Sequence, residues 1–414
     1  MRILVLNSGS SSLKFQLTEY PSATLGDQAD STTIVQGIVT DIGKEASLKI
    51  RVPPDSLSPS TRSDIQNHGQ AVAWIWEILG RCVSQQANGV LPLEAVGVRV
   101  VHGGHQFTQP VLIDEAVLDQ IEALSPLAPL HNPPCLEGIY QIRTLVGPHI
   151  PIVAVFDTAF HHTLPSHAST YAIPKLWTSQ YGIRRFGFHG IAHASLAENY
   201  ARHAHRSLKE LRLITFQLGH GCSATAIDHG YSVETSMGFS PLEGLVMGTR
   251  SGDLDPAIVP YLAGKTHLSL NDLSHQLNTQ SGLLGLSGQS SDMRSLLQTA
   301  NDDPTSSAAL AIRVFIHRAK KYLGAYLAIL GGVDAVVFGG GIGEHSPDIR
   351  AGICQDMDWC GLTLDHNANA QVHGLPAGAI LPIHDPASDM DVVVGGTDEE
   401  AWIGRETRRL LLNR

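Results

Sequence analysis

The stretch RILVLNSGSSSLKFQL, residues 2–17, carries the first architectural signal in this 414-residue chain. Its apolar runs at residues 2–6 and 13–17 are predicted to be strands, and the segment between them begins at Asn7 and is rich in serine. The pattern predicts a β-hairpin with an anion-binding tip, because small side chains leave backbone amides free to point at an anion. It recurs where LITFQL (213–218) leads through GHGCS into ATAI (224–227). This recurrence predicts a duplicated fold with two related halves.

Length and composition predict an ordinary globular protein of two domains, since a chain of this length exceeds what one hydrophobic core usually supports. Hydrophobic residues make up 43% of the chain and charged residues 16%, which leaves apolar material for two cores. The net charge of −11 at pH 7 argues against nucleic-acid binding, because most of the surface would repel phosphate. An anionic substrate therefore needs a local basic pocket.

Cysteine usage and the lack of long apolar stretches predict a cytoplasmic protein. The five cysteines are scattered, without the CxxC pairs that are typical of zinc and redox sites. The apolar start at residues 1–6 is too short for a signal peptide, and no apolar stretch reaches the length of a membrane span. We therefore expect neither a membrane nor a nucleic acid as a partner.

Strand-like and helix-like patterns alternate along the chain, which favours an α/β fold. Residues 65–82 and 308–330 have the apolar spacing of amphipathic helices and are expected to serve packing. The Ser/Pro-rich segment 54–63, PDSLSPSTRS, is predicted to be a surface loop. A last helix is expected over residues 401–412, with Thr397 and Glu400 forming a capping box that leaves Glu399 free.

Two further segments combine glycine with charge. In PLEGLVMGTRSGDLDP, residues 241–256, Arg250 stands in a turn of small residues, where its donor fork suits a phosphate or carboxylate. An ordinary solvated turn is the alternative from this segment alone. A third glycine cluster, residues 339–344, follows the apolar run 335–338, although neither a GxGxxG nor a GxxxxGK[ST] motif occurs. Together with the tips at residues 7–12 and 219–223, this cluster makes three glycine-containing turns that each follow an apolar strand, which favours phosphate binding.

Local sequence leaves several residues open between a functional and a structural role. His189 could be a core histidine within an aromatic turn, and Asp157, at the end of the apolar run 152–156, could cap a helix. Lys14 could be a solvated strand lysine. Asn132 and Pro133 read as a helix N-cap followed by a first-turn proline.

Taken together, the motifs resemble the acetate kinases, the acetokinase family of the acetate and sugar kinase, Hsp70 and actin superfamily. The resemblance covers nearly the whole chain and runs in order through NSGSSSLKFQL from Asn7, RVVHGG from Arg99, PLHNP from Pro129, FDTAFH from Phe156, RRFGFHG from Arg184, TSMGFSPLEGLVMGTRSGDLDP from Thr235, SGLLGLSGQSSDMR from Ser281, GGIGEHS from Gly340 and TDEE from Thr397.

The resemblance implies an α/β fold of two domains with duplicated ribonuclease H-like, actin-like ATPase cores and an active-site cleft between them. The expected division is residues 1–155 plus 400–414 for the N-terminal acetokinase domain and 156–399 for the nucleotide-binding domain. A homodimer is implied as well.

The implied reaction is reversible transfer of the ATP γ-phosphoryl group to acetate, giving acetyl phosphate and ADP, with Mg²⁺ or Mn²⁺ as cofactor. A carboxylate is ionised at pH 7 and attacks in line without a general base, so positioning and charge neutralisation are the protein's tasks. A propionate or butyrate kinase of the same family is the alternative.

The resemblance also implies roles for individual residues. The catalytic group comprises Arg99, His131, Asp157, His189 and Arg250. The metal site uses Asn7 and Glu399. The nucleotide contacts are expected from Ser10, Ser12, Lys14, Gly219, His220, Gly221, Asp292, Met293, Arg294, Gly341, Ile342, Gly343, Glu344 and His345. A small apolar pocket of Val101, Leu130, Phe188 and Pro241 favours acetate, with propionate as a poorer substrate.

Some positions depart from the family pattern. His220 and His345 stand where asparagine is usual, Val98 where histidine is usual, and Ile191–Ala192 where Thr-Ser is usual. An imidazole donates a hydrogen bond as an amide does, but it is larger and can take up a proton. We therefore expect an active enzyme whose nucleotide preference or optimum pH is altered.

Overall fold

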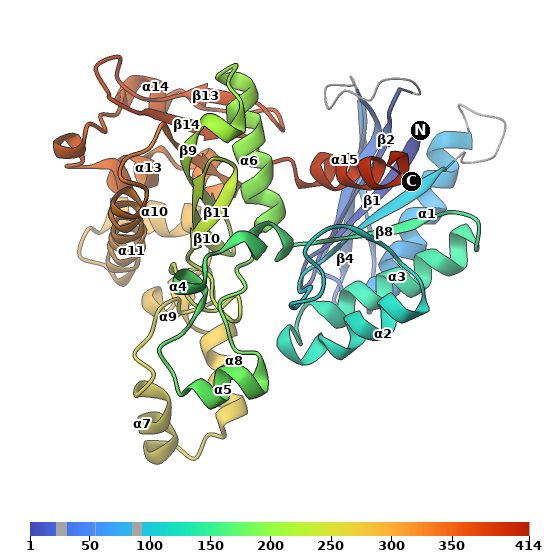
Figure 1. Cartoon of the computed structure of the whole chain (residues 1–414), viewed down its shortest axis with the longest axis horizontal. Coiled ribbons are helices and arrows are strands. Elements are labelled where there is room, and N and C mark those ends of the chain that lie inside the picture. The colour runs from blue at the N-terminus through green and yellow to red at the C-terminus, as the bar shows by residue number, and fades with distance from the viewer. Residues whose placement is uncertain (22–30, 54, 85–92, 414) are drawn as a thin grey trace. The chain divides into compact units, whose positions relative to one another are not determined.

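The computed structural model describes residues 1–21, 31–53, 55–84 and 93–413. It divides into two units, Met1–Ala159 with Glu399–Arg414 and Phe160–Asp398 (Figure 1). The division expected from the sequence puts residues 156–159 and Glu399 with the second unit, whereas here they lie in the first. Phe156 ends a strand of the first unit, the Asp157 amide donates to Val100 O, and Glu399 begins a helix that packs on the same sheet. The predicted α/β fold is confirmed.

The first unit is built on an eight-stranded sheet in the order β5-β4-β3-β2-β1-β6-β8-β7. The predicted hairpin is confirmed as β1 and β2, which pair antiparallel, while β1, β6 and β8 run parallel. The strands are β1 (Arg2–Ser8), β2 (Leu13–Glu19), β3 (Thr32–Thr40), β4 (Ala46–Val52), β5 (Asp55–Arg62), β6 (Ala95–Val100), β7 (Val111–Leu112) and β8 (Ile152–Phe156).

Helices cover both faces of this sheet. Leu4, Leu6 and Val98 face a buried core shared with α1 (His68–Ser84) and α3 (Asn132–Val146), and α2 (Glu115–Ala123) packs on α3. Alternate strand residues point to opposite faces, so Gly97 faces α15 (Glu399–Leu412) on the other side. The helix predicted over residues 65–82 and the C-terminal helix are thereby confirmed.

The segment predicted to be a loop at residues 54–63 is mostly an edge strand, β5, which pairs antiparallel with β4. Residue 54 lies outside the described residues. Proline is tolerated there because an edge strand has one unpaired side and the pairing is irregular between Leu48 and Ile50, opposite this part of β5. Turn-forming composition misled the sequence-based prediction.

The second unit repeats the core topology of the first. Its sheet has the order β11-β10-β9-β12-β14-β13, with an antiparallel meander of β9 to β11 and parallel neighbours β9, β12 and β14. The strands are β9 (Arg212–Leu218), β10 (Cys222–Asp228), β11 (Tyr231–Thr235), β12 (Ala335–Gly339), β13 (Ile380–Pro382) and β14 (Asp391–Gly395). In the first unit β1, β2, β3, β6 and β8 occupy the corresponding places, so the predicted duplication is confirmed.

Helices α6 and α11 pack against this second sheet, α6 through a core that includes Leu196, Tyr200 and Val337. The helix predicted over residues 308–330 is confirmed as α11. The helices of the unit are α4 (Ser166–Ser169), α5 (Lys175–Tyr181), α6 (Gly190–His203), α7 (Ile258–Lys265), α8 (Leu270–Thr279), α9 (Gly282–Ser287), α10 (Met293–Asp302), α11 (Ser307–Leu330), α12 (Gly340–His345), α13 (Pro347–Cys354) and α14 (His366–Ala370).

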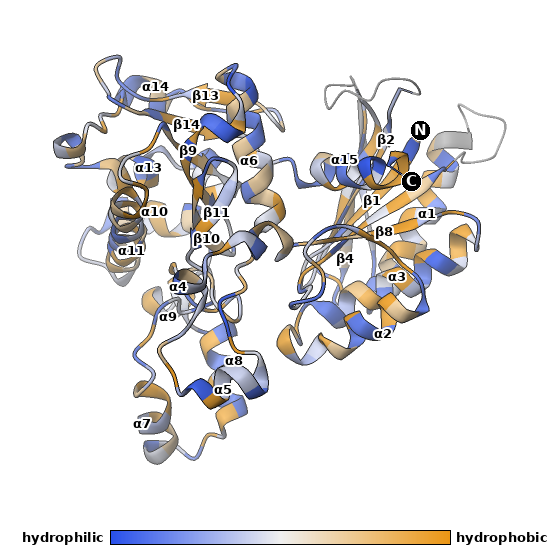
Figure 2. Cartoon of the chain, viewed as in Figure 1, coloured by the Kyte–Doolittle hydropathy of each residue, from blue (hydrophilic) through white to orange (hydrophobic). Residues whose placement is uncertain are grey.

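Hydrophobic residues follow the strands of both sheets, and helices such as α1 and α3 carry both hydrophobic and hydrophilic stretches (Figure 2). This distribution is typical of amphipathic helices packed on sheets. Across the described ranges, no helix combines the length and the apolar character that crossing a membrane requires.

Gly97 provides a test of the packing of α15 on the first sheet. A Cβ at this position would overlap Thr407 Oγ1 and lie 3.0 Å from Ile403 Cγ2, so we expect Gly97→Ala to destabilise the first unit by about 1–3 kcal/mol. Gly80→Ala in α1 is the matched control, because nothing lies within 4 Å of its added methyl group and alanine favours the helix. Thermal unfolding should show a lower midpoint for the first variant only.

Candidate functional site

Arg250 lies in a turn that is braced by a segment distant in sequence. Within the turn the Met247 amide donates to Arg250 O at 3.2 Å. The start of α9 then bonds to the turn, with Leu283 N donating to Met247 O at 2.8 Å and Ser281 N to Thr249 O at 2.9 Å. The SGLLG motif therefore supports the arginine turn through backbone hydrogen bonds.

Gly282 makes this brace possible. Its φ is +60°, and a Cβ there would overlap Met247 O and lie 2.7 Å from Arg250 O. Only glycine fits this combination of a left-handed backbone and a close approach.

Asp253 ties the same turn to α11. Its carboxylate accepts from Gly244 N at 2.9 Å, from Arg318 Nη1 at 2.8 Å and from Tyr322 Oη at 3.0 Å. The turn is thus held on two sides, which fixes the direction in which Arg250 leaves the backbone.

Arg250 and His189 converge on one point at Gly221, in the hairpin tip between β9 and β10. A Cβ at Gly221 would lie 2.9 Å from Arg250 Nη2 and 3.2 Å from His189 Nε2. Arg250 Nη1 donates to Pro241 O at 2.7 Å, which orients the guanidinium. A cationic fork and an imidazole nitrogen that face the same small space suit an anionic oxygen.

His189 itself has an unusual backbone and a defined partner. It precedes α6 with φ 57° and ψ 24°, and its Nδ1 lies 2.8 Å from Ser223 Oγ on β10. The left-handed conformation is uncommon for a residue other than glycine and is found disproportionately at functional sites. These features favour the functional interpretation of His189 over a core histidine.

His220 sits beside the arginine turn. Gly248 N donates to His220 O at 2.9 Å, and a Cβ at Gly248 would come within 2.6 Å of the His220 ring. Partial burial and the charge of Arg250 lower the pKa of His220. The imidazole is therefore neutral at pH 7 and can act as a hydrogen-bonding group in the way an asparagine amide does.

In the first unit, Arg99 organises the carboxyl ends of three parallel strands. Its Nη2 donates to Asp157 Oδ2 at 2.8 Å, and its Nη1 donates at 3.2 Å both to Asn7 Oδ1 and to Ser8 O. Asp157 is 1% exposed. Burial opposes the charge of Arg99, but the carboxylates of Asp157 and Glu399 outweigh it and raise the arginine pKa. Asp157 directly follows β8, so its predicted position at the end of a strand is confirmed.

Two glutamates at the start of α15 share the side-chain amide of Asn7. Asn7 Nδ2 donates to Glu399 Oε2 at 2.6 Å and to Glu400 Oε1 at 2.7 Å, and Lys14 Nζ lies 3.9 Å from Glu400. Burial raises the pKa of Glu400, and the charge of Glu399 adds to this effect. Burial also disfavours the charge of Glu399, but Lys14 and Arg99 outweigh it and lower the Glu399 pKa.

The predicted capping box is wrong. Thr397 N donates to Glu344 Oε1 at 3.1 Å, and Thr397 Oγ1 accepts from Gly340 N at 3.0 Å. Glu400 instead lies at Asn7 and Lys14. Both glutamates, rather than Glu399 alone, thus belong to the polar cluster.

The first hairpin tip, which holds Ser10 and Ser12, is braced from α1. Gly9 N donates to Ser12 O at 2.8 Å, and His68 Nε2 donates to Gly9 O at 2.9 Å. Both neighbours of this nitrogen are carbonyls, since Ser12 O lies 3.3 Å away, so it carries the proton. Sequence reasoning missed His68, which has no local motif.

The glycine cluster after β12 is a short helix, not a loop as predicted. Gly340 has a φ of +77°, and a Cβ there would lie 2.6 Å from Leu218 O, so the chain turns sharply beside the second hairpin tip. Residues Gly340–His345 then form α12, which includes Gly341, Ile342 and Gly343.

Arg350 is a supporting residue that sequence reasoning also missed. It is fully buried, and its Nη1 donates to Gly343 O at 2.7 Å and to Glu344 O at 3.1 Å. A cation at a helix C-terminus stabilises the helix. Burial lowers the Arg350 pKa to about 10, which leaves it charged at pH 7.

The SSDMR segment contributes a helix cap. Asp292 is the N-cap of α10 and accepts from Arg294 N at 3.4 Å. The Met293 side chain is buried, whereas the Arg294 side chain is 85% exposed. Of the three residues, Asp292 and Arg294 thus present side chains to solvent and Met293 packs inside.

In the PLHNP motif the helix N-cap is not the predicted Asn132. His131 is the N-cap residue of α3, and Asn132 is the first helical residue. The Asn132 side chain instead bonds the backbone of His102, accepting from its N at 3.1 Å and donating to its O at 3.2 Å. The asparagine therefore links α3 to the RVVHGG motif.

The predicted acyl pocket draws on both units. Val101 and Leu130 belong to the first unit, where Val101 is buried and Leu130 is 49% exposed. Phe188 and Pro241 belong to the second, where Phe188 is buried. The pocket and the interdomain cleft stay predictions.

Carboxylate oxygens in the first unit are of the kind that Mg²⁺ prefers. Asp157, Glu399 and Glu400 supply them, and Mg²⁺ typically uses one or two carboxylates, substrate phosphates and water. Among the described residues, no group of three His, Cys, Asp or Glu could hold a metal ion alone. This donor set fits a metal that a nucleotide brings with it.

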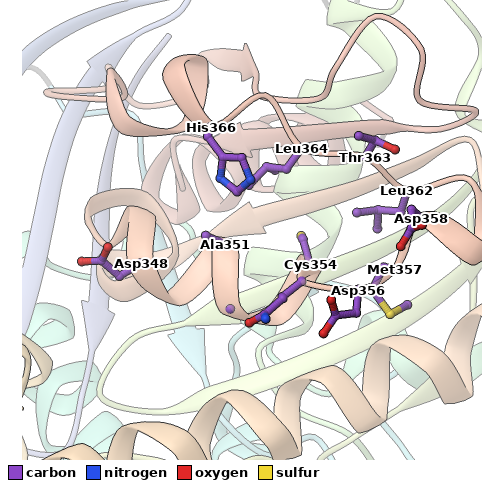
Figure 3. Close-up of a pocket in the computed structure, with 12 residues that line it drawn as sticks. Asp348, Ala351, Cys354, Asp356, Met357, Asp358, Leu362, Thr363, Leu364 and His366 are labelled. Carbon is purple, nitrogen blue, oxygen red and sulfur yellow. The ribbon is translucent and has the colours of Figure 1, made fainter. Parts of the chain in front are cut away.

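A cavity of about 490 Å³ lies elsewhere in the second unit, along α13 and the segment after it (Figure 3). Asp348, Asp356 and His366 are among its lining residues, and none of the predicted site residues lines it. Burial raises the pKa of Cys354, another lining residue, to about 12, so its thiol stays protonated at pH 7.

The duplicated core topology, together with the relatives described next, places the protein among the phosphotransferases with an actin-like ATPase fold. A sequence model of the Acetokinase family matches residues 2–405, and the chain belongs to this family. The acetate kinase of Chloroherpeton thalassium is 44% identical, and the alignment covers all of both chains.

Solved structures agree with this assignment. The crystal structure of Porphyromonas gingivalis acetate kinase is similar with a TM-score of 0.86 and 37% identity over 99% of each chain. A propionate kinase from Francisella tularensis subsp. tularensis SCHU S4 also has a TM-score of 0.86, with 36% identity over 99% of each chain.

The buried His102 of RVVHGG predicts a pH dependence of stability. Its burial lowers the pKa to about 4, whereas the pKa in the unfolded chain is 6.5. Between pH 6.5 and pH 4 the unfolded chain therefore binds a proton at His102 that the folded chain does not. Stability should be full above pH 6.5 and fall by about 1.4 kcal/mol per pH unit below it.

Urea midpoints between pH 8 and pH 5 test this dependence against His102→Asn, whose amide oxygen can still accept from Gly104 N. The variant should be less stable at pH 8 but lose less stability on acidification. Parallel curves for the two proteins would contradict the assignment.

Proposed function

We propose that this protein is an acetate kinase, which transfers the γ-phosphoryl group of ATP reversibly to acetate. The convergence of Arg250 Nη2 and His189 Nε2 on the space beside Gly221 carries the proposal. Membership of the Acetokinase family supports it, as do relatives named acetate kinase over the full length of the chain.

The proposed chemistry is direct in-line displacement. An acetate oxygen forms a bond to the γ-phosphorus while the bond from that phosphorus to the bridging oxygen breaks, and ADP leaves with the electron pair. Acetate is ionised at neutral pH, so no residue has to remove a proton from it. Charge spreads over the equatorial oxygens in the transition state, where preorganised donors act most strongly.

In this scheme His189 Nε2 and Arg250 donate to the equatorial oxygens. Gly221 leaves the space that those oxygens require, since any side chain there would meet both donors. We assign nucleotide-phosphate contacts to the two hairpin tips, whose small residues allow close backbone approach.

Residues of the first unit serve the acceptor and the metal. Arg99 is proposed to bind the acetate carboxylate, and Asp157 holds its guanidinium in place. Glu399 is proposed to hold Mg²⁺, because its lowered pKa keeps it ionised, while Asn7 orients it by donating to Oε2. Mg²⁺ would neutralise phosphate charge when bound. We also propose that His131 assists in binding the phosphoryl group.

Propionate is the second candidate acceptor. The similar solved structure of a propionate kinase supports including it, since one methylene changes discrimination by only about 1–3 kcal/mol. Butyrate completes the comparison of acid length.

Arg250 tests the activity and the site together. We expect wild-type protein with ATP and Mg²⁺ to form acyl phosphate, trapped with hydroxylamine, with kcat/KM falling from acetate to propionate to butyrate. Arg250→Ala should lower kcat at least about a hundredfold, as loss of a transition-state donor does. Arg81→Ala, which removes an exposed arginine of α1, should leave the rate unchanged. Equal rates for the two variants would contradict the role of Arg250.

We also propose a homodimer, as the family resemblance implies. Two segments of the second unit support a docking surface, because they carry exposed large apolar side chains. Leu176, Trp177 and Tyr181 belong to α5, and Ile258 and Tyr261 belong to α7.

Sedimentation velocity tests this surface with matched tryptophan variants. Trp177→Glu should shift the protein toward the monomer, because a charge would be buried at the interface. Trp359→Glu, at another exposed tryptophan, should remain dimeric. A dimeric Trp177→Glu, or a monomeric Trp359→Glu, would move the interface elsewhere.

A further inference from the structure

A chain of buried side chains ends at His189. His193, one turn along α6, is fully buried, and its Nδ1 lies 2.7 Å from Thr215 Oγ1. Its Nε2 lies 2.8 Å from Ser223 Oγ, which is also 2.8 Å from His189 Nδ1. Thr215, His193, Ser223 and His189 thus form one continuous row of hydrogen bonds.

The hydroxyl of Thr215 fixes the proton on His193. Within the described part of the chain, His193 Nδ1 is the one hydrogen-bond partner of Thr215 Oγ1, and Thr215 is fully buried. A buried hydroxyl hydrogen without an acceptor is costly, so the threonine must donate to Nδ1. The neutral ring then carries its proton on Nε2. Burial lowers the pKa of His193 well below its usual range, which keeps the ring neutral.

The same accounting applies to Ser223, which is also fully buried. His193 Nε2 donates to Ser223 Oγ, so the serine hydrogen is left for the other ring. Among the residues that the structure describes, His189 Nδ1 is the remaining partner of this hydroxyl. Ser223 therefore donates to His189 Nδ1, and the proton of the neutral His189 ring stands on Nε2, the atom that faces Gly221.

We propose that Ser223 and His193 are positioning residues that hold His189 in its Nε2–H tautomer, aimed at the phosphoryl group beside Arg250. The inference rests on the proposed function of His189. In the opposite tautomer Nε2 would present a lone pair to an anion, which repels instead of binding.

Histidine at position 193 suits this role because it links two hydroxyl groups that donate their hydrogen bonds in the same direction along the row. A hydroxyl at position 215 or 223 can turn either way by itself, whereas the ring accepts at one nitrogen and donates at the other. The direction set at Thr215 on β9 is thus passed through α6 to Ser223 on β10.

Matched pairs of variants test the row. Ser223→Ala and Thr215→Val remove a hydroxyl, whereas Ser223→Thr and Thr215→Ser retain it. We expect the first two to lower kcat about tenfold with KM for acetate and ATP nearly unchanged, because the donor acts in the transition state. The hydroxyl-retaining variants should recover most of the rate. Circular dichroism and unfolding midpoints identify any variant that fails to fold.

Nitrogen chemical shifts of the labelled histidine rings report the tautomer directly, with the His189 signals assigned by their loss in His189→Gln. Wild-type protein should show Nε2–H at His189, and Ser223→Ala and Thr215→Val should show a mixture. Nδ1–H at His189 in the wild type would overturn the inference. If the wild-type protein is active, a folded Ser223→Ala variant with the wild-type kcat would also overturn it.

The two readouts separate this inference from the proposed function. The wild-type protein could show Nε2–H at His189, with this tautomer lost in Ser223→Ala, and yet phosphorylate no short acid. This result would support the positioning row and contradict the kinase assignment. If the wild-type protein is active and His189→Gln retains full activity, His189 has no role in catalysis, and the positioning role of Ser223 and His193 is contradicted as well.

Discussion

The close approach of Arg250 and His189 to the backbone at Gly221 is the constraint on which the second unit depends. Arg250 and His189 can face one point because no side chain stands between them. A preorganised pair of donors is effective only if neither moves when charge appears, so each must be held by other groups. The arginine turn is held by α9 and Asp253, and His189 is held by Ser223.

The duplicated topology places comparable chemistry at corresponding positions. In each unit, polar residues gather where the parallel strands end, and a hairpin tip lies beside them. The halves differ in charge. The first concentrates carboxylates around Arg99 and Lys14, whereas the second brings together an arginine and imidazoles.

Buried polar residues carry much of the precision of both sets. Asn7 bonds two carboxylates and an arginine, and Asn132 bonds the backbone of His102 through both atoms of its amide. Arg350 similarly holds the end of α12. Buried networks of this kind restrict the geometry, because another arrangement would leave more donors and acceptors without partners.

Sequence by itself determined the two hairpins, the α/β alternation, the helices 65–82 and 308–330, and the motifs that place the chain in its family. Those features depend on periodicity and turn chemistry within a few residues. Tertiary structure alone decided that residues 55–62 pair as a strand, that Glu400 contacts Asn7, and that Phe156 and Glu399 belong to the first unit. It also decided that His68, His193 and Ser223 support the site. The strand at residues 55–62 pairs with its neighbour in the sequence, β4, against its turn-forming composition. The other outcomes depend on partners far apart in the sequence, whose proximity only the folded chain creates.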